Sequence, residues 1–314
     1  MHTITFLHVT SYCGNVIYLF GEVYIQLLHA AGSLVGLAVG DAFGAPLEGL
    51  ASPTETVREM GYSYRHGRKP GTFTDDTEQA LAVARSLVRS RGFSPEDMMA
   101  ELVQAYRSDP AVYGPTSRRV FDLVLLGMDP RDAARAAHEM NQGSRSNGSV
   151  MRGPPIGIWY DGPEVEVYSM ACSRLTHFDP VAGACSSFVN RMVSDLCRGR
   201  EREEAFRRAL SRCRDREVAG MLGSFREHDP VPGLDCLLAT HASLSVFMEQ
   251  DTFEETLVAA VNLGGDADTV GAIAGSLAGA RYGLSAIPRR WLAALQGLPE
   301  VLSTAWQLWH VARG

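Results

Sequence analysis

Apolar positions recur along most of the chain at the spacing of amphipathic helices. The clearest case is EQALAVARSLVRSR, residues 78–91. Its Leu81, Ala84 and Val88 lie three and four residues apart, so a helix places them on one face. The next segment, 94–108, begins with Ser-Pro, which is typical of a helix start. Further helices are predicted at 116–127, 130–141, 180–197, 201–213, 234–249, 253–263, 269–282 and 298–312.

Patterns typical of strands are rare. VEVY at 165–168 predicts one short strand, and part of the N-terminal stretch predicts another. Strands and helices do not alternate as they do in a nucleotide-binding βαβ fold. The pattern therefore predicts one all-α domain with functional loops between its helices.

The N-terminal stretch 4–32 is apolar and rich in aromatic residues. It has no Lys or Arg to form the positive end of a signal peptide. Glu22, Gln26 and His29 interrupt it, so it falls short of a clean membrane span of about 20 residues. We expect residues 1–28 to be an extension packed on a domain formed by residues 29–314, or the product of a start site placed too early. We expect a cytoplasmic protein without a membrane anchor.

Composition narrows the class of protein. Of the 314 residues 46% are hydrophobic, which is enough for a sizeable core, and the net charge of -7 argues against a broad nucleic-acid surface. The charged run 198–217 mixes arginines with acids and is interpreted as a solvated helix face. The six cysteines contain no Cys-x-x-Cys pair, so they predict reduced thiols and not a zinc site. We expect a monomer.

Two short clusters share one design, in which two carboxylates and a threonine hydroxyl stand just ahead of a helix. They are GTFTDDTEQAL, with Thr74, Asp75 and Asp76, and GGDADTVGAIAG, with Asp266, Asp268 and Thr269. Taken singly, each is explained by helix capping, since Asp and Thr are favoured at helix starts. A cap, however, needs one oxygen, and carboxylates brought together repel unless a cation separates them. If the two helix starts face each other, they could hold two Mg²⁺ or Mn²⁺ ions about 4 Å apart.

Two segments of small residues would let these helix starts approach. GLAVGDAFGAPLEG (36–49) and the segment 269–282 both carry glycine at every fourth position, which permits close helix packing. The first segment contains Asp41, either a buried structural acid or a further acid of the centre. It also contains Glu48, which falls at or past the helix end.

A polar loop and a histidine complete the candidate chemistry. NQGSRSNGSVMRGPPIG (141–157) runs into a helix predicted to start near Ser149, and the backbone N–H groups of such a start suit a phosphate. RLTHFDP (174–180) contains His177, which is either a satisfied loop histidine or a neutral donor to a phosphate or ribose hydroxyl.

In this order the segments resemble the ADP-ribosylglycohydrolase family, and within it the bacterial dinitrogenase reductase-activating glycohydrolases. The resemblance is carried by GLAVGDAFGAPLE (36–48), GTFTDDTEQAL (71–81), SNGSVMR (146–152), LTHFDPVAG (175–183) and VNLGGDADTVGAIAGSLAGARYG (261–283). It implies an all-α, single-domain orthogonal helical bundle with a centre of two Mg²⁺ or Mn²⁺ ions. The implied activity removes ADP-ribose from a modified protein or a small ADP-ribosyl conjugate.

The resemblance also implies roles for individual residues. The implied metal ligands are Thr74, Asp75, Asp76, Asp266, Asp268 and Thr269. The implied catalytic carboxylates are Glu48, Asp75, Asp76 and Asp266. The implied contacts with the diphosphate and adenosine are Asn147, Gly148, Ser149, Met151 and His177, and Tyr113 and Gly114 are further candidates for contact with substrate.

The chain departs from the family pattern in two places. Val112 and Tyr113 stand where the arginine-specific branch has an acid that would hold a guanidinium, and Pro232 stands where an aromatic residue is common. Arginine preference is therefore not expected, and Tyr113 becomes a candidate for stacking on substrate. Two other functions stay open: a non-catalytic binding or structural member of the fold, and a hydrolase of another ribosyl compound.

Overall fold

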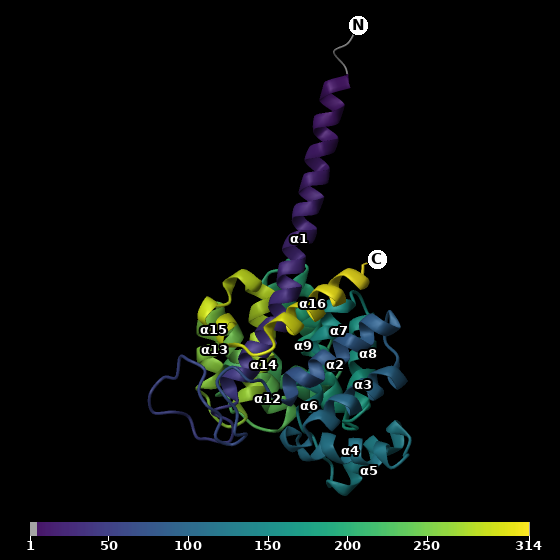
Figure 1. The fold of residues 1–314 in the computed structure, drawn as a ribbon, viewed down its shortest axis with the longest axis vertical. Helices are drawn as coiled ribbons and strands as arrows, with labels where there is room; N and C mark the ends of the chain where they lie inside the picture. The colour runs from purple at the N-terminus through teal and green to yellow at the C-terminus, as the bar shows by residue number, and fades with distance from the viewer. Residues whose placement is uncertain (1–4, 314) are drawn as a thin grey trace.

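The chain folds as a bundle of α-helices (Figure 1). The computed structural model describes the backbone of residues 5–313 and the side chains of residues 24–313. Its helices are α1 (Thr5–Gly44), α2 (Asp75–Ser90), α3 (Pro95–Ser108), α4 (Pro115–Leu125), α5 (Pro130–Met140), α6 (Gly148–Met151), α7 (Pro154–Trp159), α8 (Glu164–Arg174), α9 (Pro180–Cys197), α10 (Arg202–Arg212), α11 (Arg216–Gly223), α12 (Cys236–Glu249), α13 (Phe253–Val261), α14 (Ala267–Tyr282), α15 (Arg289–Ala294) and α16 (Leu298–Val311). Three single turns of 3-10 helix, η1 (Pro110–Val112), η2 (Phe225–Glu227) and η3 (Leu284–Ala286), lie between them.

The prediction of an all-α fold is confirmed, and the predicted strands are wrong. The N-terminal stretch from residue 5 belongs to α1, and residues 165–168 lie inside α8. A pattern of four alternating residues is too short to distinguish a strand from one turn of a helix. Here Val165 is buried while Val167 is exposed, and two acids in the first turn favour the helix start. Within residues 5–313 the only strand-like pairing is two isolated bridges, Ser63 with Arg68 and Ser146 with Asp235.

The other predicted helices are present, with ends that differ by a few residues. The helix predicted over 36–49 is the end of α1 and stops at Gly44, because Pro46 cannot supply the next helical N–H. Glu48 therefore lies in the turn beyond the helix. The sequence boundary between residues 28 and 29 falls within α1, and the division of the chain there stays a prediction.

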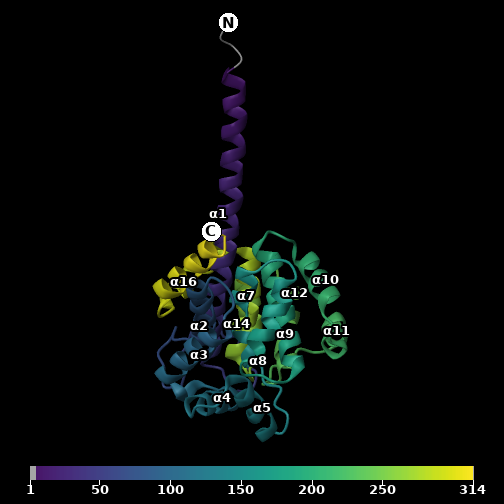
Figure 2. The same cartoon turned by 90° about the vertical axis from the view of Figure 1, so that its right-hand side faces the viewer.

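The last half of α1 is the central element of the bundle. In Figures 1 and 2 it enters the body beside α16 and lies along α14. The stretch Tyr24–Gly44 is long and apolar enough to cross a membrane by composition alone, yet 89% of its most apolar window is buried within the protein. That burial is typical of a core helix.

α1 and α14 run antiparallel with their backbones in contact. A Cβ atom on Gly36 would lie 2.3 Å from the carbonyl oxygen of Gly275, and one on Gly40 would lie 2.0 Å from that of Gly271. No side chain fits at those distances, so the predicted small-residue packing is present. It places the end of α1 against the beginning of α14.

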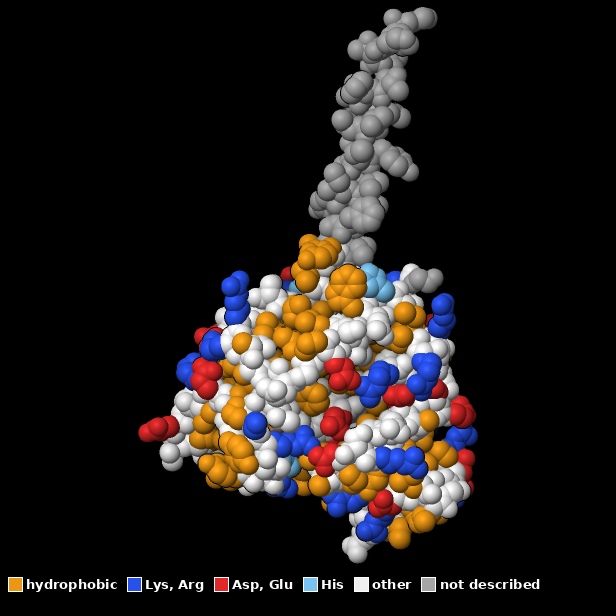
Figure 3. All heavy atoms as spheres, viewed as in Figure 1, with side chains coloured by type: hydrophobic (Ala, Val, Ile, Leu, Met, Phe, Trp, Pro, Cys, Tyr) orange, Lys and Arg blue, Asp and Glu red, His pale blue; other side chains and the backbone are white. Residues whose placement is uncertain are grey.

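Charge is spread over the surface. On the face shown in Figure 3, Lys and Arg alternate with Asp and Glu without a broad basic patch. In the charged run, Arg208 and Arg200 both pair with Asp195 of α9, and Arg200 also pairs with Glu204. These arginines fix α10 to its neighbours, and their charge is largely neutralised by acids.

Candidate active site

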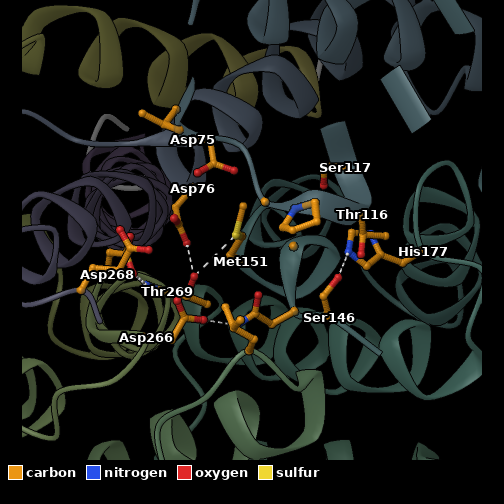
Figure 4. Close-up of a pocket in the computed structure, with 17 residues that line it drawn as sticks. Asp75, Asp76, Thr116, Ser117, Ser146, Met151, His177, Asp266, Asp268 and Thr269 are labelled. Carbon is orange, nitrogen blue, oxygen red and sulfur yellow. Dashed lines mark hydrogen bonds between the residues drawn. The ribbon is translucent and has the colours of Figure 1, made fainter. Parts of the chain in front are cut away.

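The two acidic clusters meet at one cleft. One cluster opens α2 and the other opens α14, and their side chains converge in Figure 4. The Thr269 hydroxyl donates a hydrogen bond to Asp76 Oδ1 at 2.9 Å, which joins the clusters directly. None of the six implied metal ligands is more than 8% exposed. Four carboxylates distant in sequence are thus buried together.

Helix capping does not explain these clusters. Thr74 and Asp266 occupy the N-cap positions of α2 and α14, but neither side chain accepts a capping hydrogen bond. At other helix starts the N-cap side chain does accept a capping hydrogen bond. Ser94 accepts from Asp97 N, and Asp235 accepts from Leu237 N. The side chains at these two N-cap positions are therefore not used for capping, and Thr269 and Asp76 contact each other between the two clusters.

The carboxylates form a region of strong negative charge. Burial, reinforced by the neighbouring acids, raises the pKa values of Asp75, Asp76 and Asp268 well above their usual range. Among the described side chains no Lys, Arg or His nitrogen lies within 4.0 Å of these carboxylates. Buried oxygen donors without a cationic partner fit a hard divalent ion. The residues present therefore suit Mg²⁺ or Mn²⁺.

Two roles were expected for Asp41, and it has the first of them, that of a buried structural acid. It accepts hydrogen bonds from the backbone and hydroxyl groups of both Thr74 and Thr77, the shortest being 2.6 Å from Thr77 Oγ1. These bonds attach the start of α2 to the end of α1. Asp41 therefore holds one acidic cluster in position while α14 carries the other.

Glu48 reaches the cleft and is held by two side chains that the sequence did not single out. Its Oε2 lies 2.5 Å from His66 Nε2, and its Oε1 lies 3.3 Å from Arg65 Nε. Both partners sit at the tip of a tight turn closed by the bridge between Ser63 and Arg68. No motif marks this turn, because Arg65 and His66 reach Glu48 only through tertiary folding. Glu48, His66 and Asp268 each offer a ligand atom, and these atoms lie within 4.8 Å of one another.

The polar loop forms the opposite wall. The Asn147 amide donates to Asp266 Oδ2, and Gly148 lies so close to His177 that a Cβ there would be 3.0 Å from the ring. The helix predicted to start near Ser149 is the single turn α6, ended before Pro154. Its dipole is correspondingly small, so any anion binding here depends on side chains and individual N–H groups.

Most predicted site residues line the cleft, and three do not. The predicted residues that line it are Glu48, Asp75, Asp76, Gly114, Asn147, Gly148, Met151, His177, Asp266, Asp268 and Thr269. Residues that the sequence did not single out also line it: Pro115, Thr116, Ser117, Ser146 and Leu234. Thr74 and Ser149 lie behind the lining.

Tyr113 also lies behind the cleft wall, where it is buried. Its ring packs edge-on against Tyr106 and Phe121, with centroids 5.2 and 5.9 Å away. Val112 lines the cleft and Tyr113 does not. In the same way, Leu234 lines the cleft and Pro232 does not. The position of Tyr113 does not favour stacking on substrate, since its buried ring packs against Tyr106 and Phe121 in the core.

The comparisons with known proteins agree with this architecture. The sequence model of the ADP-ribosylglycohydrolase family matches residues 26–314. The ADP-ribosyl-[dinitrogen reductase] glycohydrolase of Rhodospirillum rubrum is 32% identical over 85% of this chain and 90% of its own. An ADP-ribosylarginine hydrolase of Serratia proteamaculans is 29% identical over 90% of this chain and 79% of its own.

A solved structure gives the same answer at the level of the fold. It is described as an ADP-ribosylglycohydrolase-related protein complex and superposes with a TM-score of 0.81 and 34% identity, over 91% of this chain and 99% of that one. The paired acidic clusters, the helical bundle that brings them together and these similarities lead to one conclusion: the chain belongs to the ADP-ribosylglycohydrolase family.

Proposed function

We propose that the protein is a Mg²⁺- or Mn²⁺-dependent hydrolase that releases ADP-ribose from a modified protein side chain or a small ADP-ribosyl conjugate. The bond cleaved is the one at C1″ of the distal ribose. The observation that carries the proposal is the meeting of two acidic clusters that give up helix capping to face each other. The names of the relatives, which refer to ADP-ribosyl-[dinitrogen reductase] and ADP-ribosylarginine, support an ADP-ribosyl substrate.

The residues divide the work by position. The ions would be held by Asp75, Asp76, Asp266, Asp268 and Thr269, which line the cleft, with Thr74 directly behind them. When bound, they supply positive charge that orients ribose hydroxyls and acidifies water. Asn147, Gly148 and His177 on the opposite wall would hold the diphosphate and adenosine. The scissile C1″ would then lie between these two sets of residues, next to Glu48.

Glu48 is the residue placed to move a proton. As the bond from C1″ to the leaving atom breaks, an oxocarbenium-like charge develops on the ribose. The Glu48 carboxylate lies at the cleft wall, where it would take a proton from the attacking water or return one to the leaving atom. His66 and Arg65 hold it in place from behind.

Replacing Glu48 by glutamine is expected to lower kcat by about 10²- to 10⁴-fold, the range typical of a lost general acid or base. KM should change much less, because glutamine preserves the size of the side chain. Steady-state kinetics on the substrate with the highest turnover measure both constants. Glu55→Gln, an exposed acid of the same loop, is the control. An unchanged kcat in Glu48→Gln would rule out the proton-transfer role.

The metal requirement is tested by removal and return of the ion. The protein is incubated with ADP-ribosyl-arginine, ADP-ribosyl-serine and O-acetyl-ADP-ribose, and released product is quantified by chromatography. At least one substrate is expected to be hydrolysed with Mg²⁺ or Mn²⁺, to stop with a chelator and to resume when the ion is added back. Comparison of the three also identifies the leaving group, for which the apolar Val112 in the cleft does not favour a guanidinium.

The same assay separates the proposal from its alternatives. Folded protein that binds ADP-ribose but releases nothing from any conjugate is a binding or structural member of the family. Folded protein that neither binds ADP-ribose nor releases it acts on a different ribosyl compound or on none. The complete set of implied metal ligands favours the enzyme, because loss of some of those ligands would mark a non-catalytic member.

A further inference from the structure

A buried arginine lies between the acidic clusters and the opposite wall of the cleft. Arg152 is completely buried, and its pKa is lowered by that burial. Among the described side chains no carboxylate lies within 4.0 Å of its guanidinium. Burying a charge without an opposite charge is costly unless hydrogen bonds compensate. Arg152 makes three hydrogen bonds, to Gln79, Thr176 and the carbonyl oxygen of Cys172. The two side-chain acceptors indicate which parts of the cleft Arg152 positions.

The first of these bonds leads to the metal centre. Arg152 Nη1 donates to Gln79 Oε1 at 2.9 Å, and Gln79 Nε2 donates to Asp75 Oδ2 at 2.8 Å. An amide side chain can be rotated so that its oxygen and nitrogen exchange places. Because a guanidinium can only donate, Arg152 fixes the Gln79 oxygen on its own side. The Gln79 NH₂ group is thereby directed to Asp75.

The second bond leads to the histidine of the opposite wall. Arg152 Nη2 donates to Thr176 Oγ1 at 2.7 Å, and Thr176 Oγ1 lies 2.8 Å from His177 Nδ1. With its oxygen accepting from Arg152, the Thr176 hydroxyl has its one proton free, and among the described residues His177 Nδ1 is the acceptor that it reaches. Nδ1 is then the unprotonated ring nitrogen, and the proton of a neutral imidazole resides on Nε2.

The proton on Nε2 determines what the cleft presents to a ligand. Nε2 lies 3.0 Å from Ser146 Oγ, and both residues line the cleft. When Nε2–H donates to Ser146, the serine proton is free to be donated onward into the cleft. In the opposite tautomer Nε2 would accept from Ser146, and lone pairs would face the ligand. Burial and the charge of Arg152 lower the pKa of His177 to about 3, so the ring is neutral at physiological pH.

We propose that Arg152 and Thr176 are positioning residues that hold His177 in its Nε2–H tautomer, so that His177 donates to Ser146 and the Ser146 hydroxyl donates to the anionic diphosphate of the substrate. Through Gln79 the same guanidinium orients a ligand of the metal centre. The buried Arg152 side chain thus orients residues at both ends of the cleft. The part that concerns the diphosphate rests on the proposed function, whereas the tautomer of His177 does not.

Thr176→Val is the sharpest test, because it removes the hydroxyl and keeps the shape. In the wild-type protein, ¹⁵N NMR of histidine-labelled samples is expected to show His177 protonated at Nε2 and unprotonated at Nδ1. Thr176→Val should shift protonation toward Nδ1 and weaken ADP-ribose binding about tenfold, the effect of roughly one hydrogen bond. KM should rise while kcat stays within about twofold, since Glu48 and the acids are untouched.

Two further variants control this result. Thr176→Ser keeps a hydroxyl and should restore both the tautomer and the ADP-ribose affinity. Thr240→Val makes the same change at a buried threonine that donates to Cys236 O at 2.7 Å, away from the cleft, and should leave both unchanged. A wild-type His177 protonated at Nδ1, or a Thr176→Val protein with unchanged tautomer and affinity, would overturn the proposal.

Arg152→Lys extends the test to the metal centre. Lysine keeps the charge but has no second arm with which to hold Gln79 and Thr176 together. It should therefore weaken binding of Mn²⁺ alone, measured by titration calorimetry, by about 10-fold, as expected for the partner of a metal ligand. It should also alter the His177 tautomer. Absence of both changes contradicts the proposal. Absence of hydrolysis in the wild type contradicts the proposed function and leaves the NMR test of the tautomer intact.

Discussion

Replacing Asp268 by asparagine is expected to abolish metal-dependent hydrolysis and, at the same time, to raise the melting temperature of the metal-free protein. The two effects have one cause. Asp268 is 5% exposed, and burial together with the charges of Asp76 and Asp266 raises its pKa well above 3.8. Asparagine keeps the shape and can still accept from Thr269 N, but it removes the charge that both binds a cation and repels its neighbours.

The loss of activity is expected to be about 100-fold or more, since even the outer partners of metal ligands are worth 10- to 100-fold. The gain in stability follows from the raised pKa. A folded-state pKa above the unfolded value means that the metal-free protein loses stability as pH rises through that pKa. Asp268→Asn should flatten this pH dependence.

Both effects are measurable on the same sample. Hydrolysis is followed with added Mn²⁺, and thermal unfolding is followed in a chelator between pH 4 and pH 8 (about the range that raised carboxyl pKa values span). Asp229→Asn, at an exposed position, is the matched control and should change neither quantity. An active Asp268→Asn enzyme would refute the metal site. A lower metal-free melting temperature would refute the repulsion.

Adding one methyl group to Gly40 is expected to destabilise the protein by about 2 kcal/mol or more. In an ordinary helix, Gly→Ala is stabilising by up to about 1 kcal/mol, because alanine restricts the unfolded chain. At Gly40 the new Cβ would lie 2.0 Å from the carbonyl oxygen of Gly271 and 2.4 Å from its carbon. Those atoms are backbone and cannot rotate away, so the two helices must separate.

Urea unfolding of Gly40→Ala measures the change in the free energy of unfolding. The matched control is Gly220→Ala in α11, where a Cβ would meet nothing within 4 Å and should stabilise the protein. Separation of α1 from α14 would also move Asp41, the neighbour of Gly40, and with it the start of α2. Affinity for Mn²⁺ should therefore fall together with stability. A Gly40→Ala protein as stable as the wild type would contradict the close packing.

The sequence predicted two kinds of feature well: those with a repeating pattern, and those with more polar groups than the local structure needs. Helix periodicity identified the fold class, and an excess of carboxylates over what capping needs identified both acidic clusters. It failed where a pattern was short, as at 165–168, where burial of Val165 and not alternation decided the structure.

Contacts made only by tertiary folding could not be predicted. His66 and Arg65 lie in a polar turn closed by the bridge between Ser63 and Arg68, and they reach Glu48 only in the folded chain. Tyr113 is adjacent in the sequence to two cleft residues: Val112, which ends the 3-10 turn η1, and Gly114. The Tyr113 side chain nevertheless enters the core, and no sequence pattern distinguishes it from its neighbours.

The contact between α1 and α14 also determines when the site can exist during synthesis. Ser33 and Ser276 share a hydrogen bond of 2.8 Å across 243 residues of sequence. α1 is therefore synthesised well before α14, the helix that covers its glycine face. Until α14 is made, the glycine face of α1 lacks the helix that covers it, and a contact so distant in sequence slows folding and favours association with chaperones. An interrupted chain that lacks α14 would carry half of the acidic ligands and no centre, so metal binding reports that translation has reached the second cluster.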